Sequence, residues 1–438
     1  MTAALVIAAP ASGSGKTVVT LAILRHLNRR GRRVASFKVG PDYIDPGFHR
    51  RASGAPCYNL DPWAMRAATR RAIVGHAAAA DFALVEGVMG LFDGATADAG
   101  STADIAAEFG WPVILVVDVG AQASSAAALV RGFLTHRADV EIAGIVLNRV
   151  GGPGHVRTLK AALAPLGLPV LGAIPPDPRL TVPSRHLGLV LAEEHGDLDA
   201  FLDGAANAIA AHVEIDALVA LGRPLPAPSP APAPLIPALG RRIAIARDAA
   251  FAFVYPHLEA AWRAEGAALV PFSPLADQAP EPAADAVFLP GGYPELHAVR
   301  LARSRTFLDG LRTAVAHGAT VYGECGGYMV LGETLVARDG SSHVMAGLLP
   351  LATSFAAPAL RIGYRRLIST VASALGPRGS RFRGHEFHYA QVVSQGDAAP
   401  LFVARDAEGE NEASLGLVKG TAMGSFAHLV DSAEFAPD

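Results

Sequence analysis

Short apolar runs alternate with amphipathic or alanine-rich stretches through the first half of the chain. The apolar runs are rich in Val, Ile and Leu on both faces, which is typical of parallel strands buried between helices. We therefore predict an α/β domain whose parallel sheet carries helices on both faces. The predicted strands are residues 4–8, 33–38, 82–86, 113–118, 142–148 and 170–174, and the predicted helices include 17–30, 64–76, 124–136 and 153–166.

A proline-rich segment interrupts this pattern. Residues 223–238 carry a proline at nearly every second position, and such a segment forms an extended spacer rather than a helix or a sheet. A docking site for a proline-binding partner is the less favoured interpretation. The spacer divides the chain into a domain of residues 1–222 and a domain of residues 239–438.

The second half begins with another α/β pattern, which then changes. Its predicted strands are residues 242–247, 267–272, 284–289 and 319–322, and its predicted helices are 251–265 and 303–317. Beyond Cys325, glycine, aromatic and β-branched residues alternate through 361–368, 386–393, 401–404 and 415–423. This alternation favours a mixed sheet with antiparallel strands at its end.

Composition and charge exclude several classes of protein. The 438 residues are 51% hydrophobic and carry a net charge of −3, so nothing in the overall charge favours a nucleic acid or a membrane surface. No apolar run reaches the roughly 18 residues of a membrane span, and we interpret the apolar N-terminus as a first strand rather than a signal peptide. Two cysteines are too few for a disulfide framework and are typical of a reducing cytoplasm. The sequence is compatible with a homodimer but does not fix the number of chains.

A phosphate-binding loop follows the first predicted strand and leads into the first predicted helix. In such a loop the backbone N–H groups surround phosphates, the lysine reaches the terminal phosphates of ATP, and the last hydroxyl binds Mg²⁺. The motif departs from the usual pattern because Pro10 occupies its first glycine position. The residues expected to bind ATP here are Ser12, Gly13, Ser14, Gly15, Lys16 and Thr17.

Two further polar residues end predicted strands of the same sheet. Lys38 ends the second strand, and we expect its ammonium group to contact the phosphates of ATP. Asn148 ends the strand 142–148, where it either reads an adenine edge or caps a loop. Ligands of parallel sheets bind at the carboxyl ends of the strands, so both residues are expected to lie near the phosphate loop.

Carboxylates also follow these strand ends. Glu86 directly ends a hydrophobic strand and is the best candidate for a carboxylate that binds Mg²⁺, an ion that takes one or two carboxylates together with water and phosphate oxygens. We expect the metal to be held by Thr17, Asp42 and Glu86. Asp45 and Asp93 are candidates for phosphoryl transfer or substrate contact. The alternative for the three aspartates is turn formation beside proline and glycine.

Cys325 lies between the end of a predicted strand and an apolar stretch that can begin a helix. Gly323, Gly326 and Gly327 surround it in the G-x-C-x-G pattern of a nucleophile elbow, a tight turn that holds the side chain out at the edge of a sheet. The helix start behind it favours a thiolate and a developing oxyanion. The alternative is an inert, buried cysteine.

A cysteine nucleophile needs an oxyanion site and a base. The Gly-Gly turn after the strand 284–289 offers the N–H of Gly292, which we expect to lie beside the N–H of Gly326. His428 is the preferred base, and His385 and His388 are its rivals. The alternation around these two rivals predicts a strand with the two histidines on opposite or staggered faces, which disfavours zinc binding there.

Six motifs occur in order along the chain, and together they resemble those of one enzyme family. They are the phosphate loop, Val39-Gly-Pro-Asp-Tyr-Ile-Asp-Pro46, Glu86-Gly-Val-Met-Gly-Leu-Phe-Asp93, Leu289-Pro-Gly-Gly-Tyr-Pro-Glu295, Gly323-Glu-Cys-Gly-Gly-Tyr-Met329 and Gly384-His-Glu-Phe-His-Tyr389. The chain resembles the cobyrinate and hydrogenobyrinate a,c-diamide synthases of cobalamin biosynthesis. That family pairs a dethiobiotin-synthetase-like ATPase domain with a class I glutamine amidotransferase domain.

The resemblance implies a reaction and its substrates. ATP, with Mg²⁺, would activate the a and c acetate carboxylates of a corrinoid polycarboxylate as acyl phosphates. Cys325 would release ammonia from L-glutamine with His428 as base and acid, and the ammonia would displace phosphate. The sequence leaves open whether cobalt is already in the ring. It also leaves open which arginines bind the substrate, the candidates being Arg50, Arg51, Arg361 and Arg365.

One departure concerns the acid that orients the histidine. The usual class I pattern is His-Pro-Glu, whereas this chain has His428-Leu-Val430. Asp431 or an acid elsewhere in the chain is a candidate replacement for the missing glutamate, and the sequence leaves open whether any acid replaces it. We expect a glutaminase that is slow or strictly coupled to the other half. The motifs leave four alternatives open: a nickel-sirohydrochlorin a,c-diamide synthase, a cobyric acid synthase, a dethiobiotin-type carboxylase with a decayed second domain, and a ParA/MinD-like switch ATPase.

Overall fold

The chain divides into two compact units. The computed structural model describes residues 2–180, 184–185, 188–227 and 236–433. Unit 1 contains Met1–Trp63 and Ala67–Pro232, and unit 2 contains Ala64–Arg66 and Ala233–Asp438. Within the described ranges, no helix is both long and apolar enough to cross a membrane.

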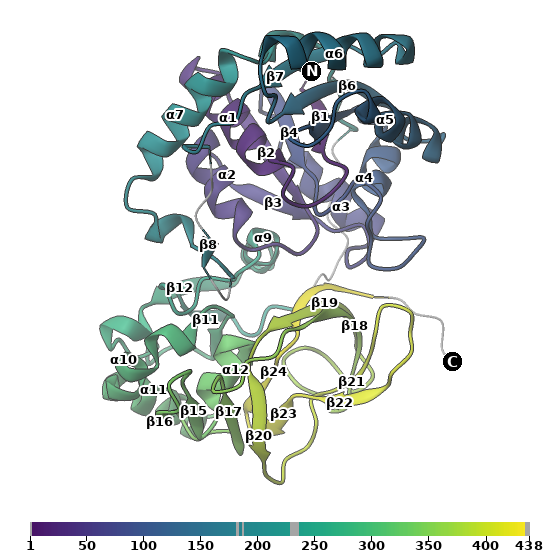
Figure 1. The fold of residues 1–438 in the computed structure, drawn as a ribbon. Coiled ribbons are helices and arrows are strands. Elements are labelled where there is room, and N and C mark those ends of the chain that lie inside the picture. Colours follow the sequence, from purple (N-terminus) through teal and green to yellow (C-terminus); the bar gives the residue numbers. More distant parts are fainter. Residues whose placement is uncertain (1, 181–183, 186–187, 228–235, 434–438) are drawn as a thin grey trace. The chain divides into compact units, whose positions relative to one another are not determined.

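Unit 1 is built on a parallel sheet with the strand order β3-β2-β4-β1-β5-β6-β7 (Figure 1). The burial of nearly every residue in the central strands explains their continuous apolar runs. The predicted strands are confirmed to within about a residue at each end, and β3 was missed. The strands are β1 (Ala3–Ala8), β2 (Val34–Val39), β3 (Cys57–Leu60), β4 (Phe82–Glu86), β5 (Val113–Asp118), β6 (Ile142–Asn148) and β7 (Val170–Ile174).

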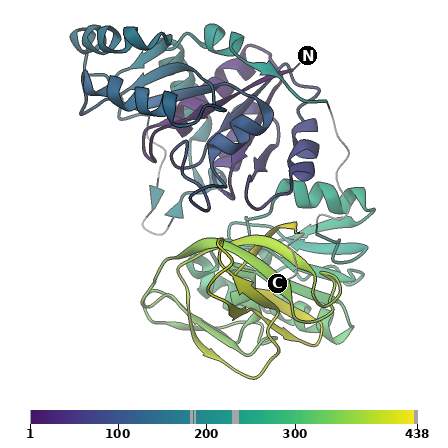
Figure 2. The ribbon, with the colours of Figure 1, turned by 90° about the vertical axis from the view of Figure 1, so that its right-hand side faces the viewer.

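Helices cover both faces of this sheet (Figures 1 and 2). Helices α1 and α2 connect strands in the direction of β3, whereas α3 to α6 connect strands in the direction of β7. Right-handed crossovers therefore place these two groups of helices on opposite faces of the sheet. Helix α7 packs against α1 and α2. The helices are α1 (Lys16–Arg29), α2 (Asp45–Ser53), α3 (Ala67–Gly75), α4 (Thr102–Phe109), α5 (Ser125–His136), α6 (Pro153–Leu163), α7 (Leu198–Ala210) and α8 (Ile215–Ala220).

The first residues of the predicted spacer belong to unit 1. Arg223 and Pro224 form the two-residue strand β10, which pairs antiparallel with Ala3 and Ala4 of β1. The neighbouring strand β5 joins β1 only from Val6 onward, so the start of β1 has backbone groups that β10 can pair. The spacer residues 228–235 lie outside the described residues.

Unit 2 contains a second α/β sheet with the order β12-β11-β13-β14-β24-β23, parallel except for the last pair. Its strands are β11 (Arg242–Ala246), β12 (Ala268–Phe272), β13 (Ala286–Leu289), β14 (Thr320–Glu324), β23 (Leu417–Lys419) and β24 (Ala422–Ser425). Its helices are α9 (Pro256–Ala264), α10 (Ala298–Arg303), α11 (Arg305–Ala316) and α12 (Gly326–Leu331). Strand β14 continues to Glu324, past the predicted end at residue 322.

The last part of unit 2 forms two further sheets with mostly antiparallel pairs, ordered β16-β15-β17-β20 and β22-β21-β18-β19-β25, in agreement with the predicted mixed end. Their strands are β15 (Thr334–Val336), β16 (Ser342–Val344), β17 (Leu351–Ser354), β18 (Arg361–Ser369), β19 (Arg381–His388), β20 (Gln391–Gln395), β21 (Phe402–Arg405), β22 (Ala413–Leu415) and β25 (His428–Ser432). The remaining short elements of the chain are β8 (Ser184–Arg185), β9 (Gly188–Leu189), η1 (Ala164–Leu166), η2 (Ala192–Glu194), η3 (Pro274–Ala276) and η4 (Pro294–His297).

Candidate functional site

The phosphate loop of unit 1 connects β1 to α1. Ser12 and Gly13 are exposed, whereas Ser14 and Lys16 are buried. Gly15 immediately precedes the helix with φ 94°, and a Cβ at this position would lie 2.3 Å from the side-chain nitrogen of Asn148. Glycine is therefore required there for both its backbone angle and its size. The loop leads directly into the N-terminus of α1, and the first backbone N–H groups of a helix have no partner within the helix and are suited to bind phosphate.

Asn148 is engaged with main-chain atoms. Its Nδ2 donates to the carbonyl of Ser14 over 2.9 Å, and its Oδ1 accepts from the N–H of Arg149 over 3.0 Å. These contacts favour the loop-capping alternative over the reading of an adenine edge. Asn148 thereby ties the end of β6 to the phosphate loop.

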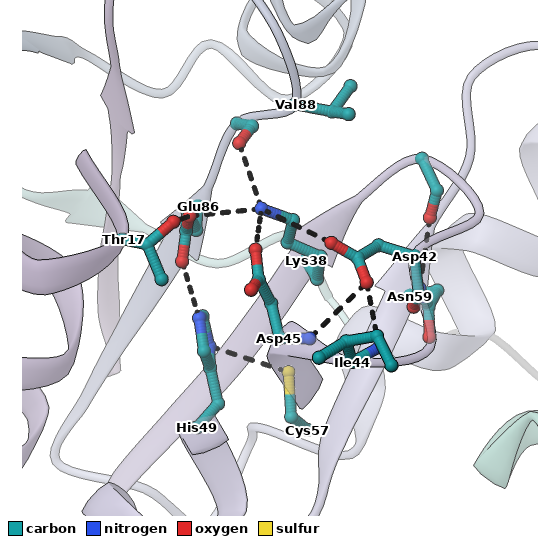
Figure 3. Close-up of polar contacts among 12 residues, drawn as sticks. Thr17, Lys38, Asp42, Ile44, Asp45, His49, Cys57, Asn59, Glu86 and Val88 are labelled. Carbon is teal, nitrogen blue, oxygen red and sulfur yellow. Dashed lines mark hydrogen bonds and ion pairs between the residues drawn. The ribbon is translucent and has the colours of Figure 1, made fainter. Parts of the chain in front are cut away.

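Buried polar residues gather beside the loop at the ends of β2 and β4 (Figure 3). The hydroxyl of Thr17 donates to Oε1 of Glu86 over 2.5 Å. The ammonium group of Lys38 lies 3.0 Å from the same oxygen, 2.6 Å from Oδ2 of Asp45 and 3.9 Å from Oδ2 of Asp42. The structure thus brings these five predicted residues into one cluster, in which Lys38 contacts carboxylates.

Electrostatics keep this cluster charged despite its burial. Burial disfavours the ammonium of Lys38, but Asp45 and the other nearby carboxylates outweigh it and raise the pKa of Lys38. Burial likewise opposes ionisation of Glu86, but Lys38 and His49 hold the pKa of this carboxyl well below its usual range. Burial and the charge of Asp42 raise the pKa of Asp45 to about 7 against the attraction of Lys38. Glu86 therefore stays ionised more firmly than Asp45.

His49 and Cys57 complete the cluster and were missed by the sequence analysis. Nε2 of the fully buried His49 lies 2.6 Å from Oε2 of Glu86, and its Nδ1 lies 3.5 Å from Sγ of Cys57. Burial disfavours the imidazolium, but Cys57 and Glu86 outweigh burial and raise the pKa of His49 to about 10. The signal available in the sequence was the spacing of Asp45 and His49, which places both on one face of a helix.

The carboxylates and Thr17 are the candidate ligands of Mg²⁺. Among the described residues, no group of three or more His, Cys, Asp or Glu side chains is arranged to hold a metal. Oδ1 of Asp42 accepts from the N–H groups of Ile44 and Asp45, which is the turn-forming alternative. The adjacent oxygens of Thr17 and Glu86 still fit an ion that takes few protein ligands and completes its shell with water and phosphate oxygens.

Asp93 also takes part in a turn. Its Oδ2 accepts from the N–H of Gly90 over 2.8 Å, and the side chain is exposed. The carbonyl of Pro10 at the start of the phosphate loop lies 2.6 Å from the position that a Cβ on Gly90 would take. Asp93 therefore shapes a loop that borders the phosphate loop.

Arg51 and Arg365, both candidate substrate arginines, form ion pairs within the part of the chain that the structure describes. Arg51 pairs with Asp199, and Nε of Arg365 lies 2.5 Å from Oε2 of Glu386. Arg50 and Arg51 line a cavity of about 890 Å³ at the C-terminal end of α2.

In unit 2, Cys325 occupies a strained turn between β14 and α12. Its φ of 47° and ψ of −103° are unusual for any residue other than glycine. The N–H of Cys325 donates to the carbonyl of Ser425 on β24 over 2.8 Å, and its carbonyl accepts from the N–H of Met329 over 3.1 Å. The geometry is that of a nucleophile elbow.

The surroundings of Cys325 hold its thiol protonated. Burial and the nearby carboxylate of Glu295 raise the pKa of the thiol, and the N–H of Gly326 opposes them only in part. Sγ lies 3.8 Å from the carbonyl oxygen of Phe387, an acceptor suited to a thiol proton. The expectation that the helix start favours a thiolate is therefore outweighed by desolvation, and the nucleophile needs a base.

The two predicted oxyanion donors lie close together. A Cβ at Gly326 would lie 3.1 Å from the backbone nitrogen of Gly292. Gly292 follows the strand β13, and Gly326 opens α12, so the two N–H groups come from neighbouring segments at the same edge of the sheet. This arrangement suits stabilisation of a tetrahedral oxyanion.

His428 lies beside the cysteine at the start of β25. A Cβ placed on Gly291 would lie 3.2 Å from Nε2 of His428 and 3.3 Å from Cβ of Cys325, so both side chains border the same small space. His385 stacks on His428 with ring centroids 5.0 Å apart, and the hydroxyl of Tyr255 lies 2.8 Å from Nε2 of His385. His385 therefore supports the ring of His428.

The other rival base and the candidate acid have different partners. Nδ1 of His388 lies 3.1 Å from the carbonyl oxygen of Ala390, and the ring of His388 stacks on Phe426. Asp431 is fully buried, and its carboxylate accepts from the backbone N–H and the guanidinium of Arg66, both over 2.9 Å. These contacts do not favour Asp431 as the acid that orients His428.

Comparison with known proteins covers both units. Residues 5–190 match the CobQ/CobB/MinD/ParA nucleotide binding domain, and residues 242–435 match the CobB/CobQ-like glutamine amidotransferase domain. The chain is 53% identical over 430 residues to a hydrogenobyrinate a,c-diamide synthase from Brucella suis biovar 1 (strain 1330), and the match covers 97% of this chain and 98% of the relative.

Relatives from other bacteria carry the same name. The one from Rhizobium meliloti (strain 1021) is 51% identical over 434 residues, with 98% of this chain and 99% of the relative covered. The one from Rhodobacter capsulatus is 52% identical over 435 residues, with 97% and 98% covered. As the six sequence motifs indicated, the chain belongs to the family of the hydrogenobyrinate a,c-diamide synthases, with a nucleotide-binding half followed by a glutamine amidotransferase half.

Proposed function

We propose that this protein uses ATP and L-glutamine to convert the a and c acetate carboxylates of hydrogenobyrinic acid into amides. The observation that carries the proposal is the presence of two complementary sites in one chain. One is a phosphate loop whose Thr17 contacts the buried Glu86, and the other is a cysteine elbow beside His428. The name of the relatives supports a corrinoid acid without cobalt as the substrate.

The glutaminase half supplies ammonia. Sγ of Cys325 bonds to the side-chain amide carbon of glutamine while His428 removes the thiol proton. The N–H groups of Gly292 and Gly326 stabilise the negative charge on the amide oxygen. His428 then returns the proton to the nitrogen, and the C–N bond breaks. Ammonia departs, and the γ-glutamyl group remains on Cys325 as a thioester. Water hydrolyses the thioester to glutamate and restores the thiol.

The ATP-binding half activates the acceptor. An oxygen of the substrate carboxylate bonds to the γ-phosphorus of ATP, and ADP leaves. Ammonia then attacks the acyl carbon, and phosphate departs as the amide forms and a proton is lost. A carboxylate has no adequate leaving group of its own, so the step through an acyl phosphate is what makes amide formation feasible.

Several residues of the cluster in unit 1 assist this step. Lys16 lies at the start of α1, where burial and the charge of Lys38 lower its pKa, so a bound polyphosphate would relieve the repulsion between the two lysines. Thr17 and Glu86 would hold Mg²⁺, with Asp42 as a further candidate, and the ion would neutralise charge on the transferred phosphoryl group. Lys38 keeps the carboxylates of Asp45 and Glu86 in place for this arrangement.

Two variants of the full chain test the proposal. Cys325→Ala is expected to abolish amidation with glutamine but to retain amidation with a high concentration of ammonium chloride. Lys16→Ala is expected to abolish amidation from both nitrogen sources, whereas Lys160→Ala on the exposed face of α6 retains both. Products from cobalt-free and cobalt-containing acids are identified by mass spectrometry. Loss of both glutamine-dependent and ammonia-dependent amidation in Cys325→Ala would contradict the proposal. ATP hydrolysis at a rate that no added tetrapyrrole changes would also contradict it.

A further inference from the structure

A buried carboxylate lies beside the ring nitrogen of His428 that does not face the cysteine. Oε2 of Glu324 is 3.6 Å from Nδ1 of His428, and the two residues are 3% and 1% exposed. The other ring nitrogen, Nε2, borders the space next to Gly291 that Cβ of Cys325 also borders. One nitrogen of the imidazole therefore lies near an acid, and the other borders the same space as Cβ of Cys325.

The carboxylate of Glu324 is fixed by its second oxygen. Oε1 accepts from the hydroxyl of Tyr322 over 3.0 Å and from the backbone N–H of Leu429 over 3.2 Å. Because Leu429 follows His428 directly, Glu324 is tied to the strand that carries the histidine. These two donors hold Oε1 and leave Oε2 turned toward Nδ1.

We infer that Glu324 takes the place of the missing triad acid and is the positioning residue of His428. The inference rests on the proposed glutaminase role of Cys325 and His428. The usual position of the acid holds Val430, which cannot accept a proton, and the carboxylate of Asp431 is bound to Arg66. A carboxylate that accepts Nδ1–H fixes the tautomer in which Nε2 can take the thiol proton. Oε2 of Glu324 and Nδ1 of His428 are 3.6 Å apart without substrate, and we expect this distance to shorten when the imidazolium forms.

The variant Glu324→Gln isolates this role because it preserves size. Tyr322 and Leu429 both donate, so the side-chain oxygen of the introduced glutamine must face them and its NH₂ group must face Nδ1 of His428. An NH₂ group in that position selects the tautomer in which Nε2 carries the hydrogen and cannot accept the thiol proton. Glutamine-dependent turnover should then fall by a factor of up to about 10⁴, the loss of kcat seen when the acid of a serine protease triad becomes an amide.

The assay compares the full-length wild type with Glu324→Gln, Glu324→Asp and the exposed control Glu333→Gln. We expect Glu324→Gln to lower kcat for glutamine with little change in its KM, and to keep ammonia-dependent amidation at the wild-type level. Glu324→Asp retains a carboxylate and is expected to recover at least about tenfold of the lost kcat. Glu333→Gln is expected to match the wild type in both assays.

The outcomes separate this inference from the proposed function. Wild-type kcat in Glu324→Gln, together with an inactive Cys325→Ala, overturns the role of Glu324 and leaves the glutaminase intact. Loss of ammonia-dependent amidation as well, or no recovery in Glu324→Asp, assigns Glu324 to the fold and also overturns the inference. Retention of glutamine-dependent activity in Cys325→Ala would instead refute the proposed function itself.

Discussion

The variant Gly291→Ala tests the geometry of the cysteine and histidine with a single methyl group. The added Cβ would lie 2.3 Å from Cε1 of His428, whereas ordinary contact begins at 3.4 Å. The imidazole must therefore retreat by roughly 1 Å, and a displacement of that size lowers the rate of a well-oriented reaction by about 10²-fold. Gly291 does not have a positive φ, so the alanine brings crowding without backbone strain.

The same crowding has a modest cost in stability. Overpacking of this kind costs about 1–3 kcal/mol, which would lower the Tm of a unit of about 200 residues by roughly 2–12 °C. The control Gly132→Ala places a methyl group in α5, where nothing lies within 4 Å, and is expected to leave Tm unchanged or slightly raised.

The assay follows glutamine-dependent and ammonia-dependent amidation in parallel. We expect Gly291→Ala to lose about 10²-fold in kcat with glutamine and to keep ammonia-dependent amidation, since the nucleotide-binding domain lies in residues 5–190. Full activity with glutamine would refute the assignment of His428 and Cys325 to one site. Equal losses with both nitrogen sources would show that the alanine damages the fold instead.

Three further predictions concern other contacts. His49→Asn removes the anchor of Glu86 and should raise the Mg²⁺ concentration for half-maximal amidation about 10-fold or more, measured by titration of Mg²⁺ at saturating ATP. Asn148→Ala releases the phosphate loop and should raise KM for ATP about fivefold with either nitrogen source, because one half-buried hydrogen bond is worth about 1 kcal/mol. Burial and Glu295 raise the pKa of Cys325, so iodoacetamide should alkylate this thiol more slowly than the thiol of an unfolded peptide at about pH 8. The rate of alkylation should still rise between about pH 8 and pH 9, and mass spectrometry measures it.

Each of these predictions has a control and an opposing outcome. His212→Asn and Asn207→Ala change exposed side chains of unit 1 and should leave the Mg²⁺ requirement and KM for ATP unaltered. An unchanged Mg²⁺ titration in His49→Asn would contradict the anchoring role, and an unchanged KM for ATP in Asn148→Ala would contradict the tie to the phosphate loop. Rapid alkylation of Cys325 that levels off below about pH 8 would contradict a protonated resting thiol.

The sequence predicted those strands that are buried on both faces. β4, β5, β6 and β7 were found at their predicted residues because a parallel strand between two helical layers needs an uninterrupted apolar run. β3 was missed since its Asn59 breaks the run, yet this side chain is buried and donates to the carbonyls of Gly40 and Asp42. Residues 415–423 were predicted as one strand, but Gly416 and Gly420 adopt positive φ and divide them.

The candidate site was predictable where its functional residues lie close together in the sequence. The phosphate loop and the turn at Cys325 are local motifs, so spacing alone located them. The contact between His49 and Glu86 spans 37 positions, and the approach of Glu324 to His428 depends on the pairing of distant strands. No local pattern records such contacts, because they arise from the order of strands in the folded sheets.

The ion pair between Arg66 and Asp431 joins residues 365 positions apart, and it bears on how the chain can be divided. Arg66 lies far before the proline-rich spacer, yet residues 64–66 group with unit 2. A fragment of residues 239–438 would keep the fully buried Asp431 but lose its cation, at a cost of about 3–5 kcal/mol. That is a large part of the about 5–15 kcal/mol that stabilises a typical domain. The amidotransferase half therefore depends on a residue that lies within the sequence of the nucleotide-binding half. A cut at the proline-rich spacer would remove Arg66 from the fragment that needs it.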